Sequence, residues 1–276
     1  MYKYQFEFEN TLNNDFPYVS SKKRNLSYDV PHYHSELEII YVTDGSLTAI
    51  ADNEKYTVED DEFFIFMPGV VHSFNKAQTN SYYYAKILPA QVPGGADFSS
   101  LRPLCCAIKH GSILHEKLLS AITNLFRENE DMQHGYEFAI LRYANEIAEK
   151  LLRYGRLNVI TKDEQTKVAA KLEFMKSVNT FIEENYHEKI ELEDAARACG
   201  YSKFYFAHFF KESTQISFYS YVTAYRLERA VYMMRTSGKS ITQIAHECGF
   251  GSVRSFDRAF KKYYSVSPTE FLKTQI

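Results

Sequence analysis

The chain has 276 residues, of which 45% are hydrophobic and 24% charged, so it is long enough for about two globular domains with cores of their own. Its net charge of −3 is unevenly divided: residues 166–276 carry 16 Lys and Arg against 12 Asp and Glu, and the remainder is acidic. This asymmetry fits a nucleic-acid contact on one domain. The sequence has no signal-peptide core and no apolar run long enough for a membrane span, which argues against a secreted or membrane protein and favours a cytoplasmic one. It also has no CxxC spacing, which argues against a disulfide-rich or zinc protein.

The first part of the chain has the texture of β-structure. Between Tyr18 and Leu88, short runs rich in Val, Ile, Tyr and Phe are separated by turn signals. The candidate strands are ELEIIYVT, SLTAIAD, KYTVED, EFFIFM, VVHSF and YYYAKIL. Asp44-Gly45 and Asp52-Asn53 have the composition of hairpin turns. Short strands at this close spacing predict a small sandwich or barrel.

Two helices are expected next, after a loop from Pro89 to Pro103 that is rich in proline and glycine. Apolar residues at helical spacing predict the first over Ile113–Glu128 and the second over Tyr136–Tyr154. The second helix has one apolar side, made of Phe138, Leu141, Ile147, Ala148, Leu151 and Leu152. Residues 155–165 are polar and end this helix, so we place a domain boundary there.

The remainder predicts only helices. An amphipathic helix over Leu172–Tyr186 is followed by a helix-turn-helix from Leu192 to Glu212 and by a long helix over Phe218–Arg235. A second helix-turn-helix begins at Ile241, with Ser240 and Gln243 in capping-box spacing. Ser252 is the expected cap of its second helix, and Pro268 opens a short last helix.

The two helix-turn-helix stretches repeat one another. Ala196, Cys199 and Gly200 recur as Ala245, Cys248 and Gly249. Further matching pairs are Ser202 and Ser252, Phe206 and Phe256, Phe210 and Phe260, and Lys211 and Lys261. Duplication predicts two equivalent subdomains joined by the long helix, which fixes the distance between them. Two recognition helices held in this way can enter successive major-groove segments, ~34 Å apart, from one side.

Each second helix has an outward stripe placed to contact DNA. The first stripe is Lys203, Phe204, Ala207 and His208, and the second stripe is Val253, Arg254, Asp257 and Arg258. Arginine suits bidentate hydrogen bonds to guanine, while Asp257 either accepts from a cytosine amino group or orients a neighbouring arginine. Phe204 and Val253 suit thymine methyl groups, and Lys211 and Lys261 suit phosphate contacts. The competing interpretation is a solvated helix face, and duplication of the whole motif favours the DNA-contacting one.

The region from about Phe174 to Lys273 resembles the double helix-turn-helix domain of AraC/XylS-type transcriptional regulators. The resemblance depends on LEDAARACGYSKFYFAHFFKESTQISFYSYVTAYRLERA and on ITQIAHECGFGSVRSFDRAFKKYYSVSPTEFL. Glu191 departs from it, because that family usually has Ser or Thr there and glutamate caps a helix poorly. The first stripe also offers few hydrogen-bonding groups, so base recognition is expected to depend mainly on the second stripe.

His32, His34, Glu38 and His72 are the chemical constellation of the first part, within HYHSELE and PGVVH. Their pattern resembles the two cupin motifs and the N-terminal sensor domain common in AraC-type regulators. Three imidazoles and one carboxylate suit Fe, Mn, Ni or Zn, and the alternatives are a polar ligand pocket and a satisfied structural network. We assign no metal and no other cofactor. The barrel interior is the expected small-molecule site, with His34, Glu38, Tyr41 and His72 as candidate ligand-binding residues.

These observations predict a multidomain α+β protein, with an N-terminal cupin-like β-barrel and linker helices followed by a C-terminal all-α double helix-turn-helix. The expected domains are a ligand-sensing barrel over residues 1–105, a helical linker and dimerisation segment over 106–165 and a DNA-binding domain over 166–276.

The leading functional hypothesis is a transcriptional regulator, not an enzyme, that binds double-stranded promoter DNA under control of a small-molecule effector, for which a sugar is one candidate. We expect a homodimer with Leu141, Leu151 and Leu152 in its interface, contact with RNA polymerase if the protein is an activator, and no membrane partner. The competing class is a metal-dependent cupin enzyme with a helical appendage. A P-loop and a GxSxG motif are absent from the sequence.

Overall fold

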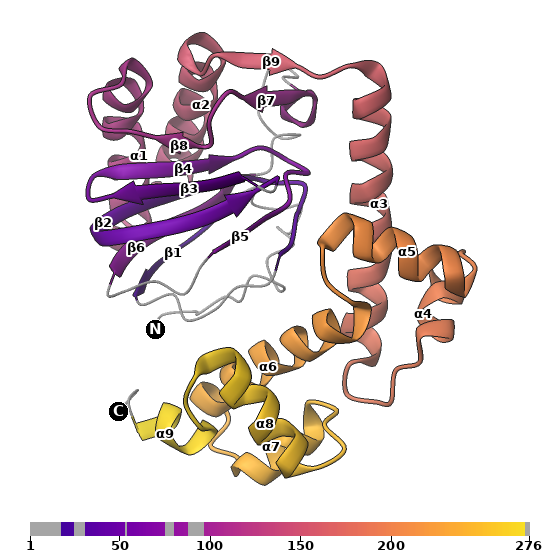
Figure 1. The fold of residues 1–276 in the computed structure, drawn as a ribbon. Coiled ribbons are helices and arrows are strands. Elements are labelled where there is room, and N and C mark those ends of the chain that lie inside the picture. Colours follow the sequence, from indigo (N-terminus) through magenta and orange to yellow (C-terminus); the bar gives the residue numbers. More distant parts are fainter. Residues whose placement is uncertain (1–17, 25–30, 53, 75–79, 88–96, 274–276) are drawn as a thin grey trace. The chain divides into compact units, whose positions relative to one another are not determined.

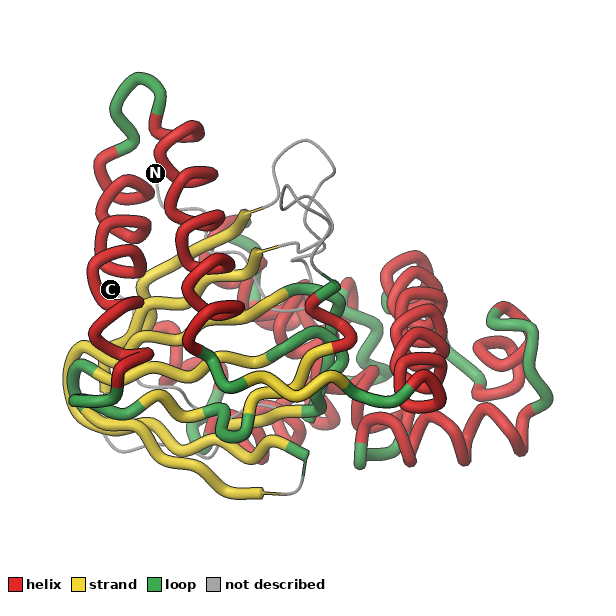
Figure 2. The backbone as a smooth tube through the Cα atoms, turned by 90° about the horizontal axis from the view of Figure 1, so that it is seen from above, coloured by secondary structure: helices red, strands yellow, loops and turns green. Residues whose placement is uncertain are grey.

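A computed structural model describes residues 18–24, 31–52, 54–74, 80–87 and 97–273 (Figures 1 and 2). The chain forms two compact units, and the division between them falls between Leu172 and Glu173. We call the part that contains His32–Leu172 the sheet unit and the part that starts at Glu173 the helical unit. None of the helices in these ranges is long and apolar enough to cross a membrane.

The sheet unit is built around one long strand, β2 (Leu37–Ala51). Its hydrogen-bonded order is β1-β6-β2-β4-β8, and β3 and β5 pair with β2 as well. The bounds are β1 Tyr18–Arg24, β3 Glu54–Glu59, β4 Glu62–Phe66, β5 His72–Phe74, β6 Asn80–Ile87 and β8 Ala107–Ile108. Because antiparallel strands pair along both halves of the long, bent β2, the sheet is curled and barrel-like, as expected from the sequence.

The predicted hairpin turn at Asp44-Gly45 is wrong, because β2 continues through both residues. The register of β2 against β6 shifts between Val42 and Asp44, and Gly45 has a φ of 80°. Before this bulge β2 pairs with β4, and after it with β3. A bulge with a left-handed glycine bends a strand sharply, so the local turn signal serves to curl the sheet. The second predicted turn joins β2 to β3 with Asp52 at a φ of 47°, whereas Asn53 lies outside the described residues.

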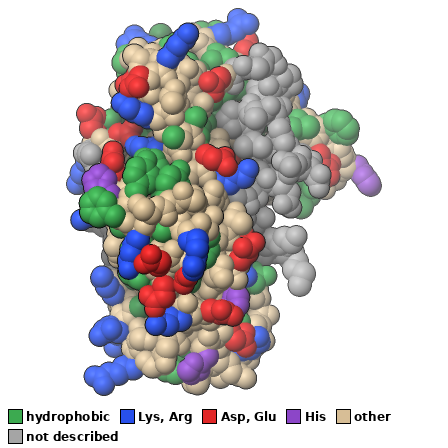
Figure 3. Space-filling view, turned by 90° about the vertical axis from the view of Figure 1, so that its right-hand side faces the viewer, with side chains coloured by type: hydrophobic (Ala, Val, Ile, Leu, Met, Phe, Trp, Pro, Cys, Tyr) green, Lys and Arg blue, Asp and Glu red, His purple; other side chains and the backbone are tan. Residues whose placement is uncertain are grey.

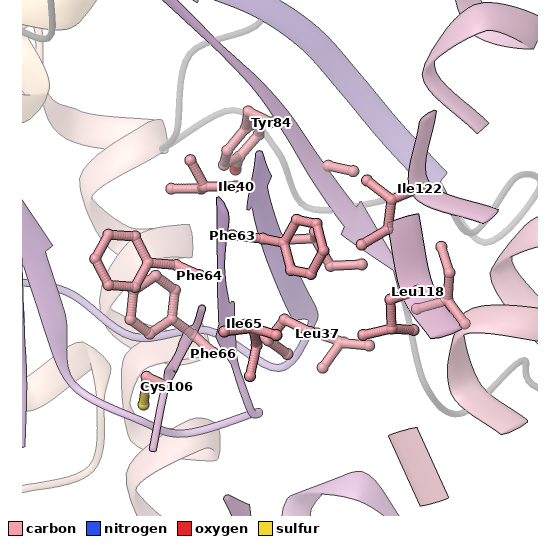
Figure 4. Close-up of a cluster of buried hydrophobic side chains, with 14 of the residues drawn as sticks. Leu37, Ile40, Phe63, Phe64, Ile65, Phe66, Tyr84, Cys106, Leu118 and Ile122 are labelled. Carbon is pink, nitrogen blue, oxygen red and sulfur yellow. The ribbon is translucent and has the colours of Figure 1, made fainter. Parts of the chain in front are cut away.

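Alternate residues of the sheet face opposite layers. Figure 4 shows Phe63 on the side of Leu118 and Ile122, whereas Phe64 and Phe66 point the other way. The helices that cover the first face are α1 (Ile113–Asp131) and α2 (Tyr136–Tyr154), both of which begin where the sequence predicts. The single apolar side predicted for α2 is partly wrong. Leu151 is buried in the core, while Phe138 is 81% and Leu152 47% exposed.

The segments on either side of these helices form structure that the sequence does not predict. A short 3₁₀ helix, η2 (Phe98–Ser100), leads into β7 (Leu101–Pro103), which pairs with β9 (Leu157–Val159). The next helix, α3 (Lys162–Asn185), begins ten residues before its predicted start at Leu172. Thr161 and Glu164 exchange hydrogen bonds at its beginning, with Thr161 N donating to Glu164 Oε2 at 2.8 Å. This capping box lies in the segment expected to be linker, so a continuous helix occupies the place of the predicted boundary.

The helical unit contains the two predicted helix-turn-helix motifs. The first consists of α4 (Leu192–Ala198) and α5 (Lys203–Thr214), and the second of α7 (Ile241–Glu247) and α8 (Val253–Tyr264). The connecting helix is α6 (Phe218–Thr236), and α9 (Pro268–Lys273) follows α8.

The two motifs have the same turn. Gly200 and Gly249 have φ values of 78° and 77°, which L-residues adopt only with strain. The next amide donates to an alanine carbonyl in each, Tyr201 to Ala196 at 2.8 Å and Phe250 to Ala245 at 3.0 Å. The sequence repeat is therefore a structural repeat.

One helix, α6, contributes to the cores of both motifs. Its first half packs Phe218 and Tyr221 against the rings of Phe206 and Phe210 in α5. Its second half buries Leu227 and other apolar residues with Ile244, Phe256 and Phe260 of the second motif. A single helix buried in both cores connects the two recognition helices through packed side chains rather than through a loop.

Candidate functional site

The second stripe lies on the exposed face of α8. Arg254 and Arg258 are exposed, whereas Phe256 and Phe260 on the opposite face are buried. Ser252 caps the helix by accepting from Ser255 N at 3.2 Å. In the described part of the chain, neither arginine pairs with a carboxylate, and Asp257 bonds to neither of them. Both guanidinium groups therefore keep all their donors available for another molecule.

Val253 and Asp257 complete the second stripe and are partly exposed, and Lys261 lies exposed one turn further along α8. Lys261 likewise has no carboxylate partner among the residues that the structure describes. The structure thus brings together the five residues predicted for the second motif on one helix face.

The first stripe differs in chemistry, although it occupies the equivalent face of α5. Lys203 Nζ lies 3.2 Å from Glu193 Oε2, and His208 Nδ1 lies 3.7 Å from Glu212 Oε2. The Phe204 ring is 84% exposed, and Ala207 is partly buried. Lys211 is exposed at the position of Lys261. Lys203 is thus paired with a carboxylate, and the most prominent feature of this stripe is an apolar ring.

An aromatic row beside the first stripe was missed by the sequence reasoning. The rings of Tyr201 and Tyr205 stack with centroids 5.1 Å apart, and Tyr205 stacks on Phe209 at 5.6 Å. Figure 3, seen from the side where α4 and α5 lie in Figure 1, shows hydrophobic side chains exposed among charged ones. The spacing of Tyr201, Tyr205 and Phe209 at intervals of four residues would have revealed this row.

Glu191 shows the departure noted in the sequence. Its side chain makes no capping hydrogen bond at the start of α4 and instead lies 2.6 Å from Lys189 Nζ. The other helices of the two motifs begin with a serine cap. The start of α4 therefore lacks the side-chain acceptor that its counterpart α7 has.

The histidine cluster of the sheet unit is assembled from three segments. His32 and His72 exchange backbone hydrogen bonds of 2.9 Å, which places the HYH segment beside β5. The His72 ring lies 4.4 Å from that of His32 and 5.2 Å from that of His34. Glu38 enters from β2 and is fully buried. The structure thus brings His32, His34, Glu38 and His72 together, as the resemblance to the cupin motifs implies.

Hydrogen bonds orient two of these imidazoles toward one carboxylate. His34 Nδ1 donates to the carbonyl of Glu36 at 3.1 Å, and His72 Nδ1 donates to the carbonyl of Val70 at 3.0 Å. Their Nε2 atoms therefore face Glu38, at 2.8 Å from Oε2 for His34 and 3.5 Å from Oε1 for His72. Burial disfavours the charged form of Glu38, but the two imidazoles outweigh it and hold its pKa well below the usual value.

The sequence reasoning missed Lys86, which is part of this cluster. It lies opposite Glu38 in the β2–β6 register, and its side chain is only 2% exposed. Its Nζ atom is 3.8 Å from Glu38 Oε2 and 5.6 Å from the centre of the Tyr84 ring. Strand alternation could have revealed it, because Lys86 shares a strand face with Tyr82 and Tyr84, both of which are buried.

Tyr41 does not belong to the cluster. It lies three residues from Glu38 on β2 and therefore points to the opposite face of the sheet. Its hydroxyl donates to Asp61 Oδ1 at 2.8 Å, and it borders a surface hollow with Tyr83 and Phe126 of α1. The prediction that Tyr41 joins His34, Glu38 and His72 in the barrel interior is therefore wrong in geometry.

The cluster fits a metal ion in the kind and spacing of its donors. One ligand atom from each of His32, His34, Glu38 and His72 lies within 4.8 Å of all the others. Nδ1 bonds that hold the rings of His34 and His72 are typical of metal-bound histidines. The charge around the donors does not fit, because the buried Lys86 ammonium already lies beside the carboxylate. The geometry of the donors is compatible with a metal ion, but the positive charge of Lys86 opposes a second cation beside Glu38.

Comparison with known proteins places both units. A helix-turn-helix domain model matches residues 195–274, and a cupin domain model matches residues 27–82. The transposon Tn10 TetD protein of Escherichia coli is 35% identical over 102 residues, which cover 37% of this chain and 74% of that protein.

Two further comparisons extend over nearly the whole chain. The melibiose operon regulatory protein of Escherichia coli K12 is 22% identical over 252 residues, covering 88% of this chain and 83% of the relative. The crystal structure of unsaturated fatty acid bound ToxT from Vibrio cholerae superimposes with a TM-score of 0.62 at 16% identity, covering 92% of this chain and 94% of ToxT. The fold of this chain is therefore the two-part fold of that structure.

Proposed function

Because this chain belongs to the AraC/XylS-type family of DNA-binding transcriptional regulators, we propose that its two motifs engage successive major-groove segments on one side of a promoter. The observation that supports this proposal is the burial of α6 in both motif cores, which gives α5 and α8 a fixed separation. In this arrangement the connecting helix sets the spacing of the operator half-sites.

The second stripe supplies most of the base recognition. Arg254 and Arg258 bond bidentately to guanine, and Asp257 accepts from a cytosine amino group. The first stripe contributes thymine methyl contacts through Phe204, while Lys211 and Lys261 bind phosphates and set the register. Support for this division comes from the arginines of α8, which pair with no carboxylate among the described residues, and from the ion pair of Lys203 in α5 with Glu193.

Footprinting of the full chain tests the DNA-binding arrangement. Genomic fragments that bind the purified protein are selected first, and hydroxyl-radical cleavage then maps the contacts. We expect two protected segments about one helical turn, ~10 base pairs, apart on one face of the duplex. Protection confined to a single segment would contradict simultaneous engagement of both motifs.

We also infer that a small molecule bound in the barrel interior controls DNA binding. Glu38, His34, His72 and Lys86 offer charged hydrogen-bonding groups beside the rings of Phe66 and Tyr84. Aromatic faces next to buried polar groups suit a ligand rich in hydroxyl groups, so a sugar is the favoured effector. The name of the melibiose operon relative agrees with this class, whereas the ToxT structure with an unsaturated fatty acid suggests a lipid as the alternative.

Calorimetry on the full chain separates the two effector classes. Titration with melibiose and galactose is compared with titration of oleate, on wild type and on Glu38→Gln. A sugar effector gives saturable heat that the variant loses. Saturable binding of oleate alone would reject the sugar and support the lipid.

We propose that the regulator acts in the cytoplasm as a homodimer through the exposed face of α2, and that it contacts RNA polymerase where it activates. An effector shifts the equilibrium only if it binds one arrangement of the dimer better than the other. The competing enzyme hypothesis requires a metal ion at the histidine cluster, which Lys86 opposes, and the relatives are named as regulatory proteins.

A further inference from the structure

Lys86 is a buried cation beside the four side chains whose donor atoms could hold a metal ion. It projects from β6 opposite Glu38, with its ammonium group 3.8 Å from Oε2 and almost no exposed side-chain surface. A charge removed from water in this way is tolerated only when an opposite charge compensates it. Glu38 is the only carboxylate within ion-pair distance of Lys86 among the described residues.

The cluster therefore contains its own compensating charges. Glu38 Oε2 lies 2.8 Å from His34 Nε2, and Glu38 also lies near His72, while a second buried carboxylate, Glu36, is 3.3 Å from His34 Nδ1. The Lys86 ammonium lies beside the carboxylate that would have to ligate a metal ion, so it repels a divalent cation at that position.

We propose that Lys86 replaces a metal ion as the permanent counter-charge of Glu38, so that the histidine cluster works as a metal-free polar site. The donor set keeps the kind and spacing of a metal site, but the ammonium excludes the ion. A ligand of this site is consequently bound by hydrogen bonds and ionic contacts, and not through coordination to a metal. Removal of the single charge on Lys86 should convert the cluster into a functional metal site.

The test compares Co²⁺ binding by the full chain before and after the charge is removed. Lys86→Met keeps an unbranched side chain, one atom shorter, and removes its charge, and Lys86→Gln is a second neutral variant. Lys109→Met is the control, because it removes a lysine that pairs with a different carboxylate, Glu62 Oε2, at 2.7 Å. Elemental analysis gives the stoichiometry, calorimetry gives the affinity, and the visible absorption of Co²⁺ reports its coordination.

Wild type and Lys109→Met should bind no stoichiometric Co²⁺, whereas the neutral variants should bind about one ion per chain. Affinity should rise by on the order of 100-fold or more, because charges a few ångströms apart interact strongly even at an effective dielectric constant of about 20. The double variant Lys86→Met with His72→Gln should lose the gained ion, which locates it in the cluster.

Two results would overturn the proposal. One is stoichiometric, tight Co²⁺ binding by wild type, which is decisive whether or not the variants fold. The other is a neutral variant that is folded by circular dichroism and binds no more Co²⁺ than wild type. Lys86→Arg provides a last control, because it keeps the charge and should remain metal-free.

Discussion

Gly249 and Tyr186 approach each other so closely that a Cβ atom added to Gly249 would overlap the carbonyl oxygen of Tyr186. That carbonyl belongs to the residue that follows α3, whereas Gly249 forms the turn of the second motif. The corresponding Gly200 of the first motif has nothing within 4 Å of such a Cβ. The two glycines share one backbone conformation but differ in packing, so the second motif is docked onto the end of α3 at its turn.

The first prediction separates conformation from close approach. Gly200→Ala carries only the cost of a left-handed alanine, ~1–2 kcal/mol. Gly249→Ala carries that cost and also pushes Tyr186 and Arg226 away from position 249, so we expect the free energy of unfolding to fall by about 3 kcal/mol or more in total. Urea unfolding of the full chain, followed by far-UV circular dichroism, measures both losses. Equal losses would show that the contact with Tyr186 has no energetic importance.

The second prediction concerns Arg226, which holds the same junction from α6. Its Nε donates to the carbonyl of Tyr186 at 2.8 Å and its second guanidinium nitrogen donates to that of Glu188 at 2.6 Å. Arg226→Ala leaves both carbonyls without this donor and should destabilise the helical unit by ~1–3 kcal/mol. Arg226→Lys can replace one of the two bonds and should lie between the alanine variant and wild type.

Arg226→Ala should also loosen the position of the second motif, because this junction fixes the motif relative to α3. Wild type should bind poorly when one or two base pairs are inserted between the two half-sites of its operator. The variant should lose less affinity on these insertions than wild type does. A uniform loss on every spacing would mean that Arg226 contributes only to stability.

The repeated motifs could be predicted closely because their signals are local. Serine caps, a left-handed glycine and apolar residues at helical spacing lie within each stretch, and α6 begins where its pattern predicts. The path of β2 could not be predicted in this way, because Asp44-Gly45 has the composition of both a turn and a bulge. Pairing with β6, which is distant in sequence, decides between the two.

In the candidate site of the barrel, too, some residues could be predicted from the local sequence and others could not. His34, Glu38 and His72 were identified from their motif, since residue type and spacing are enough for that purpose. Residue type alone does not place Tyr41, whose orientation depends on the strand period, and it does not indicate Lys86, because a lysine is normally expected at the surface. Only the register of β2 against β6 places its ammonium next to Glu38.

The third prediction tests the second stripe on DNA. Arg254→Ala and Arg258→Ala should each weaken binding to the operator by ~1–3 kcal/mol and relax the preference at the contacted base pair. Lys261→Ala should weaken operator and random DNA alike and reduce the salt slope by about one. Lys176→Ala, which removes an exposed charge from α3, is the control for charge alone. Fluorescence anisotropy at several salt concentrations provides these values, and equal arginine losses on both DNAs would reject base recognition.

The fourth prediction concerns the proposed dimer. Phe138 and Leu152 are exposed on α2, so Phe138→Ser with Leu152→Ser should shift the protein to monomer without loss of helical content. Leu151 was predicted in this face but is buried, and Leu151→Ala should instead lower stability by ~2–5 kcal/mol while the dimer persists. Analytical ultracentrifugation of the full chain distinguishes these outcomes. A dimer that survives the double serine variant must use another surface.

The last prediction concerns acid stability where α1 joins the sheet. Glu62 accepts from Lys109 Nζ at 2.7 Å and from the amides of Glu59 at 2.9 Å and His110 at 3.1 Å. Burial raises the pKa of this carboxyl, but the bond from Lys109 and the two amides outweigh it and leave the pKa below 4.5. A lowered folded pKa means that the carboxylate stabilises the protein above pH 4.5 and loses this effect as the pH falls through the folded value.

Wild type should therefore be more stable than Glu62→Gln at neutral pH, and the difference between their melting temperatures should shrink on acidification below about pH 4.5. Glu59 is an exposed carboxylate at the end of β3, and the melting temperature of Glu59→Gln should match that of wild type at every pH. Scanning calorimetry of the full chain over this range measures the three curves. A difference between wild type and Glu62→Gln that stays constant with pH would show that hydrogen-bond geometry, and not the charge of Glu62, holds this junction.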